Sequence, residues 1–354
     1  KLARSIIRTD NLDAQLGDGL PAELVHSLPP ATIADACEAD TVLVVGPDLK
    51  EELAILHLRL RGAATKGHTK VVEINAAPSG CEPYVERAIR CGSGEAAKYL
   101  GEILNSDDDL ATRLREGSVV AVVGRSSMAE SDHSSIAVAA LIRDELPHAT
   151  FLTALRRGNV RGALDMGLAP GVLPGRTAID NPSSALDDIW GYTPSMKGLD
   201  TTGMLQAAAE GKIRTLVLLG ADPLSDFPDR NLAAEAIQRA ETVISLDNFL
   251  TASSAQADII LPTTAYGEQG GTTTNLEGRI SRLTQKITPP GSVRDDWMIA
   301  TELAWRLGGD LNLTSKEQIW REIEQVAPSH AGVTVERILS EEAREGILVQ
   351  ESSV

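Results

Sequence analysis

Two acidic residues stand directly after apolar runs in the second half of the chain. Asp222 comes two positions after the run Thr215–Gly220, and Asp247 ends the run Thr242–Asp247. If these runs are neighbouring parallel strands, both carboxylates project from carboxyl ends of strands into one crevice, where open α/β sheets bind ligands. A carboxylate there can accept hydrogen bonds from a ribose or a guanine edge. Helix capping by Asp222 and ordinary loop polarity at Asp247 explain the two residues equally well.

A second group has the chemistry to hold an anion. Arg125, Ser126 and Ser127 directly follow the apolar run Ser118–Gly124, so a guanidinium, two hydroxyls and backbone N–H groups would gather at a strand end. The alternative, which we favour, is a solvated loop in which a Ser caps the next helix.

The other reactive side chains form no recognisable site. Cys37, Cys81 and Cys91 include no CxxC pair, and the six His show no HExxH spacing. Neither a GxSxG elbow nor a GxxxxGK[ST] loop is present. The net charge of −17 argues against binding nucleic acid, and no apolar run approaches the roughly 18 residues that span a bilayer. We therefore expect no catalytic residues, no metal site and no direct insertion into a membrane.

Strands and helices alternate along most of the chain, which predicts α/β layers. The runs Thr41–Gly46, Ser118–Gly124 and Thr215–Gly220 are β-branched, continuous and end at Gly. Runs of this kind are typical of central parallel strands covered on both faces. Residues 51–61 show helical spacing and precede a strand at 70–74, which together predict a βαβ unit.

We place three regions on this chain: an α/β domain at 1–110, a second α/β domain at 111–310, and a helical, charged tail at 311–354. The first boundary falls in the polar stretch Asn105–Gly117. The Pro- and Gly-rich segment 169–195 is interpreted as a long surface connection.

One stretch raises its own question. Residues 257–279, "ADIILPTTAYGEQGGTTTNLEGR", begin as a buried strand and then continue as a long run of Gly, Thr and polar side chains. A loop of this length with little apolar content is usually functional or disordered.

The order of these motifs resembles the molybdopterin oxidoreductase family. "LGADPLSDFPD", "ISLDNFL", "ADIILP" and "GEQGGTTTNLEGR" match its Gly-x-Asn/Asp-Pro turn, its strand ending in Asp, its ADxxLP strand and its Gly/Thr-rich loop. The resemblance implies two Rossmann-like parallel-sheet domains of the type called domains II and III in formate dehydrogenase and DMSO reductase. It also implies candidate contacts to a pterin dinucleotide, vestigial or working: Gly220, Asp222, Pro223, Asp247, Thr251, Asp258, Gly271, Asn275 and Arg279.

Within that family, residues 155–176, "LRRGNVRGALDMGLAPGVLPGR", look like a segment of the G subunit branch of NADH-quinone oxidoreductase, respiratory complex I, and the chain resembles the C-terminal portion of that subunit. The resemblance implies a scaffold for electron transfer from NADH to quinone, with an empty pterin fold. It implies other hydrophilic complex I subunits as partners, at the cytoplasmic face of a bacterial plasma membrane. Iron–sulfur clusters would lie in an N-terminal portion outside this sequence.

Two alternatives stay open. One is a molybdenum or tungsten oxidoreductase of the formate dehydrogenase type, which binds molybdopterin guanine dinucleotide. The other is a stand-alone nucleotide-binding module.

Overall fold

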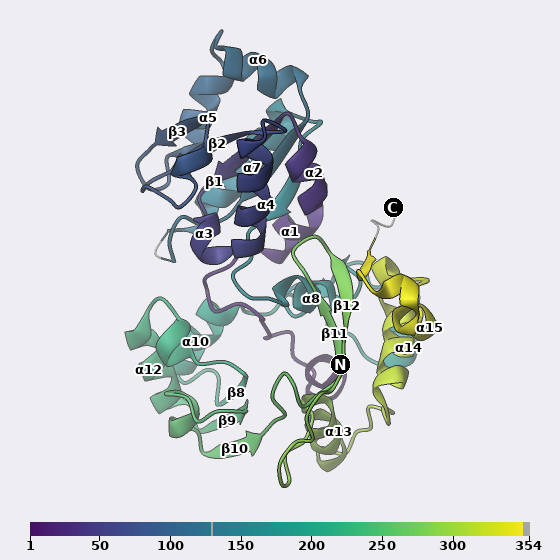
Figure 1. Ribbon diagram of the computed structural model, residues 1–354. Helices are drawn as coiled ribbons and strands as arrows, with labels where there is room; N and C mark the ends of the chain where they lie inside the picture. Colours follow the sequence, from purple (N-terminus) through teal and green to yellow (C-terminus); the bar gives the residue numbers. More distant parts are fainter. Residues whose placement is uncertain (129, 350–354) are drawn as a thin grey trace. The chain divides into compact units, whose positions relative to one another are not determined.

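The computed structural model describes residues 1–128 and 130–349, and they fold into two compact units (Figure 1). The inserted unit comprises Asp18–Gly158, and the flanking unit comprises Lys1–Gly17 and the chain from Asn159 onward. Both contain parallel sheets, so the predicted α/β class is confirmed. No helix among the described residues is long and apolar enough to cross a membrane.

The inserted unit is built on a five-stranded, fully parallel sheet with the order β3-β2-β1-β4-β5. The order reverses between β1 and β4, so a crevice at the carboxyl ends of these strands is the expected ligand position. Every residue of β1 and β4 is buried, as expected for central strands covered on both faces. The strands are β1 Thr41–Val45, β2 Lys70–Asn75, β3 Arg87–Arg90, β4 Val119–Val123 and β5 Thr150–Thr153.

Helices cover both faces of this sheet. On one face α5, α6 and α7 contribute buried side chains such as Leu100, Leu114 and Ile142 to the core formed with β1, β2 and β4, while α2 packs against α4. The helices are α1 Ala22–Ser27, α2 Ile33–Glu38, α3 Leu49–Glu52, α4 Ala54–Thr65, α5 Ala96–Leu104, α6 Asp109–Glu116 and α7 Asp132–Glu145, with a 3-10 turn η2 at Glu82–Tyr84.

The two units divide the chain differently from the regions expected at 1–110, 111–310 and 311–354. The polar stretch at 105–117 is not a boundary, because β4 pairs with β1 in register from Thr41↔Val119 onward. This pairing brings the chain up to Gly158 into the first sheet. The tail is not separate either, since Ile347 pairs with Ile280 and shares its apolar cluster.

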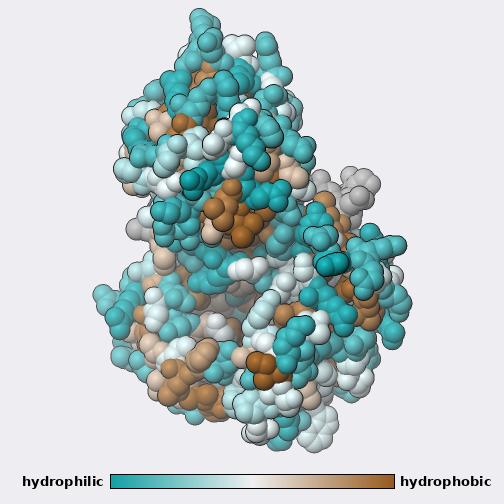
Figure 2. Space-filling model, in the orientation of Figure 1, coloured by the Kyte–Doolittle hydropathy of each residue, from teal (hydrophilic) through white to brown (hydrophobic). Residues whose placement is uncertain are grey.

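The flanking unit contains a smaller parallel sheet with the order β10-β9-β8. Helices α10 and α12 pack together, and their apolar residues share one core with the buried side chains of β8 and β9. The expectation that β8 is covered on both faces was wrong: Val217 and Leu219 are 55% and 52% exposed, and Ile259 of β10 is 45% exposed. Apolar surface gathers in this region (Figure 2). The elements are α10 Thr201–Ala209, β8 Thr215–Leu219, α11 Pro223–Asp226, α12 Arg230–Arg239, β9 Thr242–Asp247, the 3-10 turn η3 Ser254–Gln256 and β10 Ile259–Pro262.

The Gly/Thr-rich stretch is an ordered hairpin for much of its length. Gly271–Thr274 form β11, which pairs antiparallel with β12, Arg279–Leu283, and β13, Ile347–Leu348, extends that sheet. The segment 169–195, expected on the surface, is largely buried up to Gly175. The remaining elements are the π-helix η1 Leu2–Ile7, α8 Val160–Asp165, β6 Val172–Leu173, β7 Thr177–Ala178, α9 Ser184–Trp190, α13 Asp296–Arg306, α14 Lys316–Val326, η4 Pro328–His330, α15 Val335–Leu339 and η5 Glu341–Ala343.

Candidate functional site

A pocket in the inserted unit lies where the strand order reverses. It is lined by the carboxyl ends of β1, β2 and β4 and by the loop after β3, with Gly46, Asn75, Gly92 and Gly124 among its walls. Its cavity volume is about 20 Å³, which is room for a water molecule but not for a nucleotide.

Close backbone approach is one reason that the pocket is small. Gly46 has a φ of +98°, and a Cβ on it would lie 2.4 Å from the carbonyl oxygen of Gly124. Only Gly fits between these two strand ends. The Asn75 side-chain amide also donates to the carbonyl of Gly46 at 2.8 Å, so the ends of β1 and β2 are tied together beside the opening.

The carboxylate of Glu130 extends into this pocket. It accepts hydrogen bonds from the N–H of Gly94 at 2.9 Å, from the N–H of Ser126 at 3.0 Å and from the Ser126 hydroxyl. Burial opposes ionisation of Glu130, but the bonds from Ser126, Ser134 and Gly94 together hold its pKa below the usual value. The alternative that we favoured for this loop, a Ser that caps the next helix, is confirmed, because Ser131 caps α7 by accepting the N–H of His133. Ser126, one of the residues of the possible anion cradle, holds a carboxylate of the chain itself.

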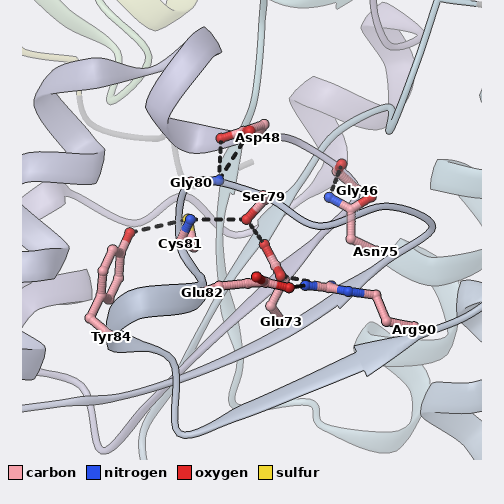
Figure 3. A network of polar contacts seen from close by, with 10 residues as sticks. All are labelled: Gly46, Asp48, Glu73, Asn75, Ser79, Gly80, Cys81, Glu82, Tyr84 and Arg90. Carbon is pink, nitrogen blue, oxygen red and sulfur yellow. Dashed lines mark hydrogen bonds and ion pairs between the residues drawn. The ribbon is translucent and has the colours of Figure 1, made fainter.

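A polar network fixes the connection between β2 and β3, which begins beside the pocket at Ala76 (Figure 3). Fully buried Glu73 accepts from the Ser79 hydroxyl and pairs with Arg90 at 2.8 Å. The carboxylate of Asp48 accepts the N–H of Gly80 at 3.1 and 3.2 Å. These bonds hold the connection against the N-terminal end of α3, which Asp48 also caps.

The same network contains a thiol with the properties of a structural residue. Cys81 is fully buried, and Tyr84 donates its hydroxyl hydrogen to the sulfur at 3.1 Å. Burial raises the pKa of the Cys81 thiol and also that of the Tyr84 hydroxyl. A buried thiol that stays protonated is a poor nucleophile, so the environment of Cys81 is that of a structural residue that orders the β2–β3 connection.

The flanking unit brings together five of the nine residues suggested by resemblance. They all lie at or just beyond the carboxyl ends of β8 and β9. These residues are Gly220, Asp222, Pro223, Asp247 and Thr251.

The two carboxylates at this edge are bonded from within the chain. Asp222 accepts the N–H of Ser253 at 3.0 Å and also its hydroxyl. Burial opposes ionisation, but these bonds and others nearby lower the pKa of Asp222. Asp247 accepts the N–H groups of Asn248 and Phe249 at 2.8 and 3.2 Å. Both carboxylates thus lie at the edge where such sheets bind ligands, but they accept hydrogen bonds from the loop that follows β9.

The structure does not bring the other four residues to this edge. Asp258 precedes β10 and accepts the N–H of Val243 at 2.8 Å, so it lies at the amino ends of the strands. Gly271, Asn275 and Arg279 belong to the β11–β12 hairpin, whose position next to α8 is marked by a 2.8 Å bond from the Thr274 N–H to Asn159.

The guanidinium of Arg279, a candidate contact to the pterin dinucleotide, lies 3.3 Å from the carboxylate of Glu277. Asn275 accepts the N–H groups of Glu277 and Arg279 at 3.0 and 2.9 Å. Both residues therefore shape the hairpin turn.

Two polar groups were missed when only the sequence was considered. Glu130 stands in the loop that follows β4, but nothing in its spacing shows that it folds back. Asp165 is fully buried and accepts two bonds from Arg176, at 2.9 and 3.0 Å, while Arg161 approaches it at 3.2 Å. Nearby His330 is 2% exposed, and burial lowers its pKa to about 4, with Asp165 opposing and Arg176 reinforcing the shift. The i, i+4 spacing of Arg161 and Asp165 was the only signal for this cluster.

The two parallel sheets and the helices packed on them define an α/β protein of the Rossmann-like type. Residues 22–306 match the model of the molybdopterin oxidoreductase family, and the chain belongs to that family.

Three known proteins illustrate the similarity. The chain is 29% identical to the NADH-quinone oxidoreductase G subunit 2 of Rhizobium meliloti (strain 1021), over 95% of this chain and 44% of that protein. It is 34% identical to F420-dependent formate dehydrogenase 1 subunit alpha of Methanococcus maripaludis, over 51% of this chain and 27% of that protein. Acetylene hydratase from Pelobacter acetylenicus shares the fold with a TM-score of 0.52 at 16% identity, covering 89% of this chain and 53% of that one. The chain thus spans less than half the length of the two curated relatives.

The family name implies a molybdopterin, whose dinucleotide form would bring phosphate groups to the pocket of the inserted unit. A phosphate needs donors that are free to receive it. Here the N–H groups of Gly94 and Ser126 are held by Glu130, and the N–H of Gly92 is held by Glu95 at 3.0 Å. The Glu130 carboxylate inside this pocket and about 20 Å³ of space do not fit a phosphate group. Among the described residues, no group of three or more His, Cys, Asp or Glu could hold a metal ion.

Proposed function

We propose that this chain is the C-terminal portion of a protein of the NADH-quinone oxidoreductase G subunit type. In this role it is a scaffold in the peripheral arm of the complex, and electrons pass from NADH to quinone through iron–sulfur clusters carried elsewhere. The observation that carries the proposal is the extent of similarity: the match to the G subunit runs over 95% of the chain, whereas the match to the formate dehydrogenase covers 51%.

The geometry of the inserted unit supports a scaffold. A subunit that binds no dinucleotide must satisfy the donors at its strand edges by other means, because buried polar groups without partners are costly. Glu130 satisfies these donors from within the chain. The partners in this proposal are the other hydrophilic subunits of the complex, at the cytoplasmic face of the plasma membrane, and the complex as a whole translocates protons.

A formate dehydrogenase-like enzyme with molybdenum or tungsten is the second candidate. It is favoured by the higher identity, 34%, over the half of the chain that matches. In that case the carboxyl edge of β8 and β9, with Asp222 and Asp247, would contact the guanine dinucleotide.

Elemental analysis separates the two candidates. The whole protein that contains this chain is purified from its own host, and molybdenum and tungsten are measured by mass spectrometry together with the fluorescence of the oxidised pterin. We expect neither metal nor pterin above background, together with co-purification of NADH-oxidising subunits. Near-stoichiometric metal and pterin would overturn the scaffold assignment in favour of the formate dehydrogenase type.

A further inference from the structure

We propose that Glu130 is an internal ligand: its carboxylate occupies the position at which the pocket of the inserted unit would hold a phosphate group, and thereby closes the pocket to phosphate. This goes beyond the scaffold assignment and does not depend on it, because it concerns only the chemistry of one pocket in the chain.

The donors around Glu130 are those that an oxyanion takes. The N–H of Gly94 comes from the loop between β3 and α5, and the N–H and hydroxyl of Ser126 come from the loop after β4. Ser134, in the first turn of α7, adds its hydroxyl. Donors from three segments thus converge on two oxygens at the carboxyl edge of a parallel sheet, which is the arrangement that binds phosphates in such folds.

Arg125 stabilises the turn from which the Glu130 carboxylate extends. Its guanidinium donates to the carbonyl of Met128 at 3.0 Å and to the carbonyl of Glu130 itself. These bonds hold the backbone of the turn, so the Glu130 side chain points back at Ser126. The cation that could have attracted a phosphate stabilises instead the turn that positions the competing carboxylate.

Charge reinforces this competition. A phosphate entering the pocket would meet the Glu130 carboxylate at the donors and the Glu95 carboxylate on the adjacent Gly92 N–H. Two negative charges in contact repel each other strongly where little water separates them. The carboxylate and a phosphate are therefore alternative occupants, and removing the carboxylate should expose a working phosphate site.

The test is isothermal titration calorimetry of the 354-residue chain with inorganic phosphate and pyrophosphate at low ionic strength. We expect Glu130→Ala to bind pyrophosphate at least about tenfold more tightly than the native chain does, since several charge-assisted bonds become available. Glu116→Ala, which removes one exposed negative charge at the end of α6, controls for the change in net charge. Adding Ser126→Ala to Glu130→Ala should weaken the new binding, because one hydroxyl donor is lost.

A second measurement needs no ligand and a milder variant. In Glu130→Gln the side chain keeps its shape but loses its charge, so the amide proton resonances of Gly94 and Ser126 should move upfield in an NMR spectrum, while Glu116→Gln leaves them in place. The inference is overturned if the native chain binds pyrophosphate as tightly as Glu130→Ala, if Glu130→Ala binds no better than Glu116→Ala, or if both amide resonances stay unmoved in Glu130→Gln. None of these outcomes depends on metal or pterin content, which decides the proposed function separately.

Discussion

Replacing Asp165 by Asn should strongly destabilise the flanking unit. Asp165 is fully buried, and the side chains of Arg161 and Arg176 around it are 7% and 11% exposed. Asn has the same shape but no charge, so it removes the carboxylate that lies beside both buried guanidiniums.

The structure gives the magnitude. Arg176 makes two bonds to Asp165, at 2.9 and 3.0 Å, and a hydrogen bond to a charged group contributes roughly 1.5–3 kcal/mol. Breaking a buried ion pair by removing one partner costs about 3–5 kcal/mol, because the remaining charge stays buried. We therefore expect Asp165→Asn to lower the free energy of unfolding by about 4 kcal/mol.

Urea denaturation followed by tryptophan fluorescence is a suitable assay, since every Trp lies in the flanking unit and the signal reports that unit alone. Asp188→Asn, at an exposed position of α9, is the matched control and should change stability by less than about 0.5 kcal/mol. A loss below about 1 kcal/mol for Asp165→Asn would refute the reasoning, because it would mean that the two guanidiniums find water or other partners at little cost. The four residues that report are Trp190, Trp297, Trp305 and Trp320.

Three further outcomes follow from the same structure. Burial lowers the pKa of His330 to about 4, so between pH 6.5 and pH 4 the unfolded chain binds a proton that the folded chain does not. The free energy of unfolding should therefore be highest above about pH 6.5 and fall towards pH 4, by at most about 3 kcal/mol. In urea titrations at several pH values, His330→Gln should remove this part of the pH dependence. Gly46→Ala should lower the melting temperature measured by circular dichroism more than Gly67→Ala does. Both glycines have positive φ, but only at Gly46 would a Cβ meet a backbone atom, at 2.4 Å. Equal losses would show that the strand ends can separate. The exposed apolar face of β8 should promote self-association, so Val217→Lys should reduce it in light scattering while changing stability by less than about 0.5 kcal/mol. Thr215→Lys adds the same charge without removing apolar surface and should have a smaller effect. A native chain that is monomeric at all concentrations would contradict this.

Much of the fold could be predicted from local pattern. The runs that became β1, β4, β8 and β9 were recognisable because continuous β-branched segments are typical of buried parallel strands. Their distribution between two sheets was not predictable in this way. β4 joins β1 through a pairing between residues 78 positions apart, Thr41 and Val119, and no property of the intervening 105–117 stretch distinguishes a surface connection from a domain boundary.

Local pattern also does not reveal what lies against a strand. "TLVLLG" and "TVLVVG" read alike, but every residue of β1 is buried, while three of the five in β8 are exposed. Asp258 illustrates the related problem of direction: the motif "ADIILP" identifies the strand, but an Asp before a strand lies at the opposite edge from one that ends it.

The candidate site shows a different reason for incomplete prediction. The residue types at the strand ends were identified from the sequence, because Gly allows close backbone approach and Ser and Asp supply hydrogen-bonding groups there. Their hydrogen-bond partners could not be, since Ser253 reaches Asp222 across 31 positions and Gly94 reaches Glu130 across 36. In both units these bonds serve the same physical requirement: donors and acceptors at the edge of a buried sheet need partners. Where a ligand supplies the partners, the loops can stay open; where the chain supplies them, the loops close. The Glu130 turn and the Asp222–Ser253 bond both close loops in this way. This common feature favours the interpretation that the chain keeps the architecture of a binding protein while its own side chains occupy the strand-end positions.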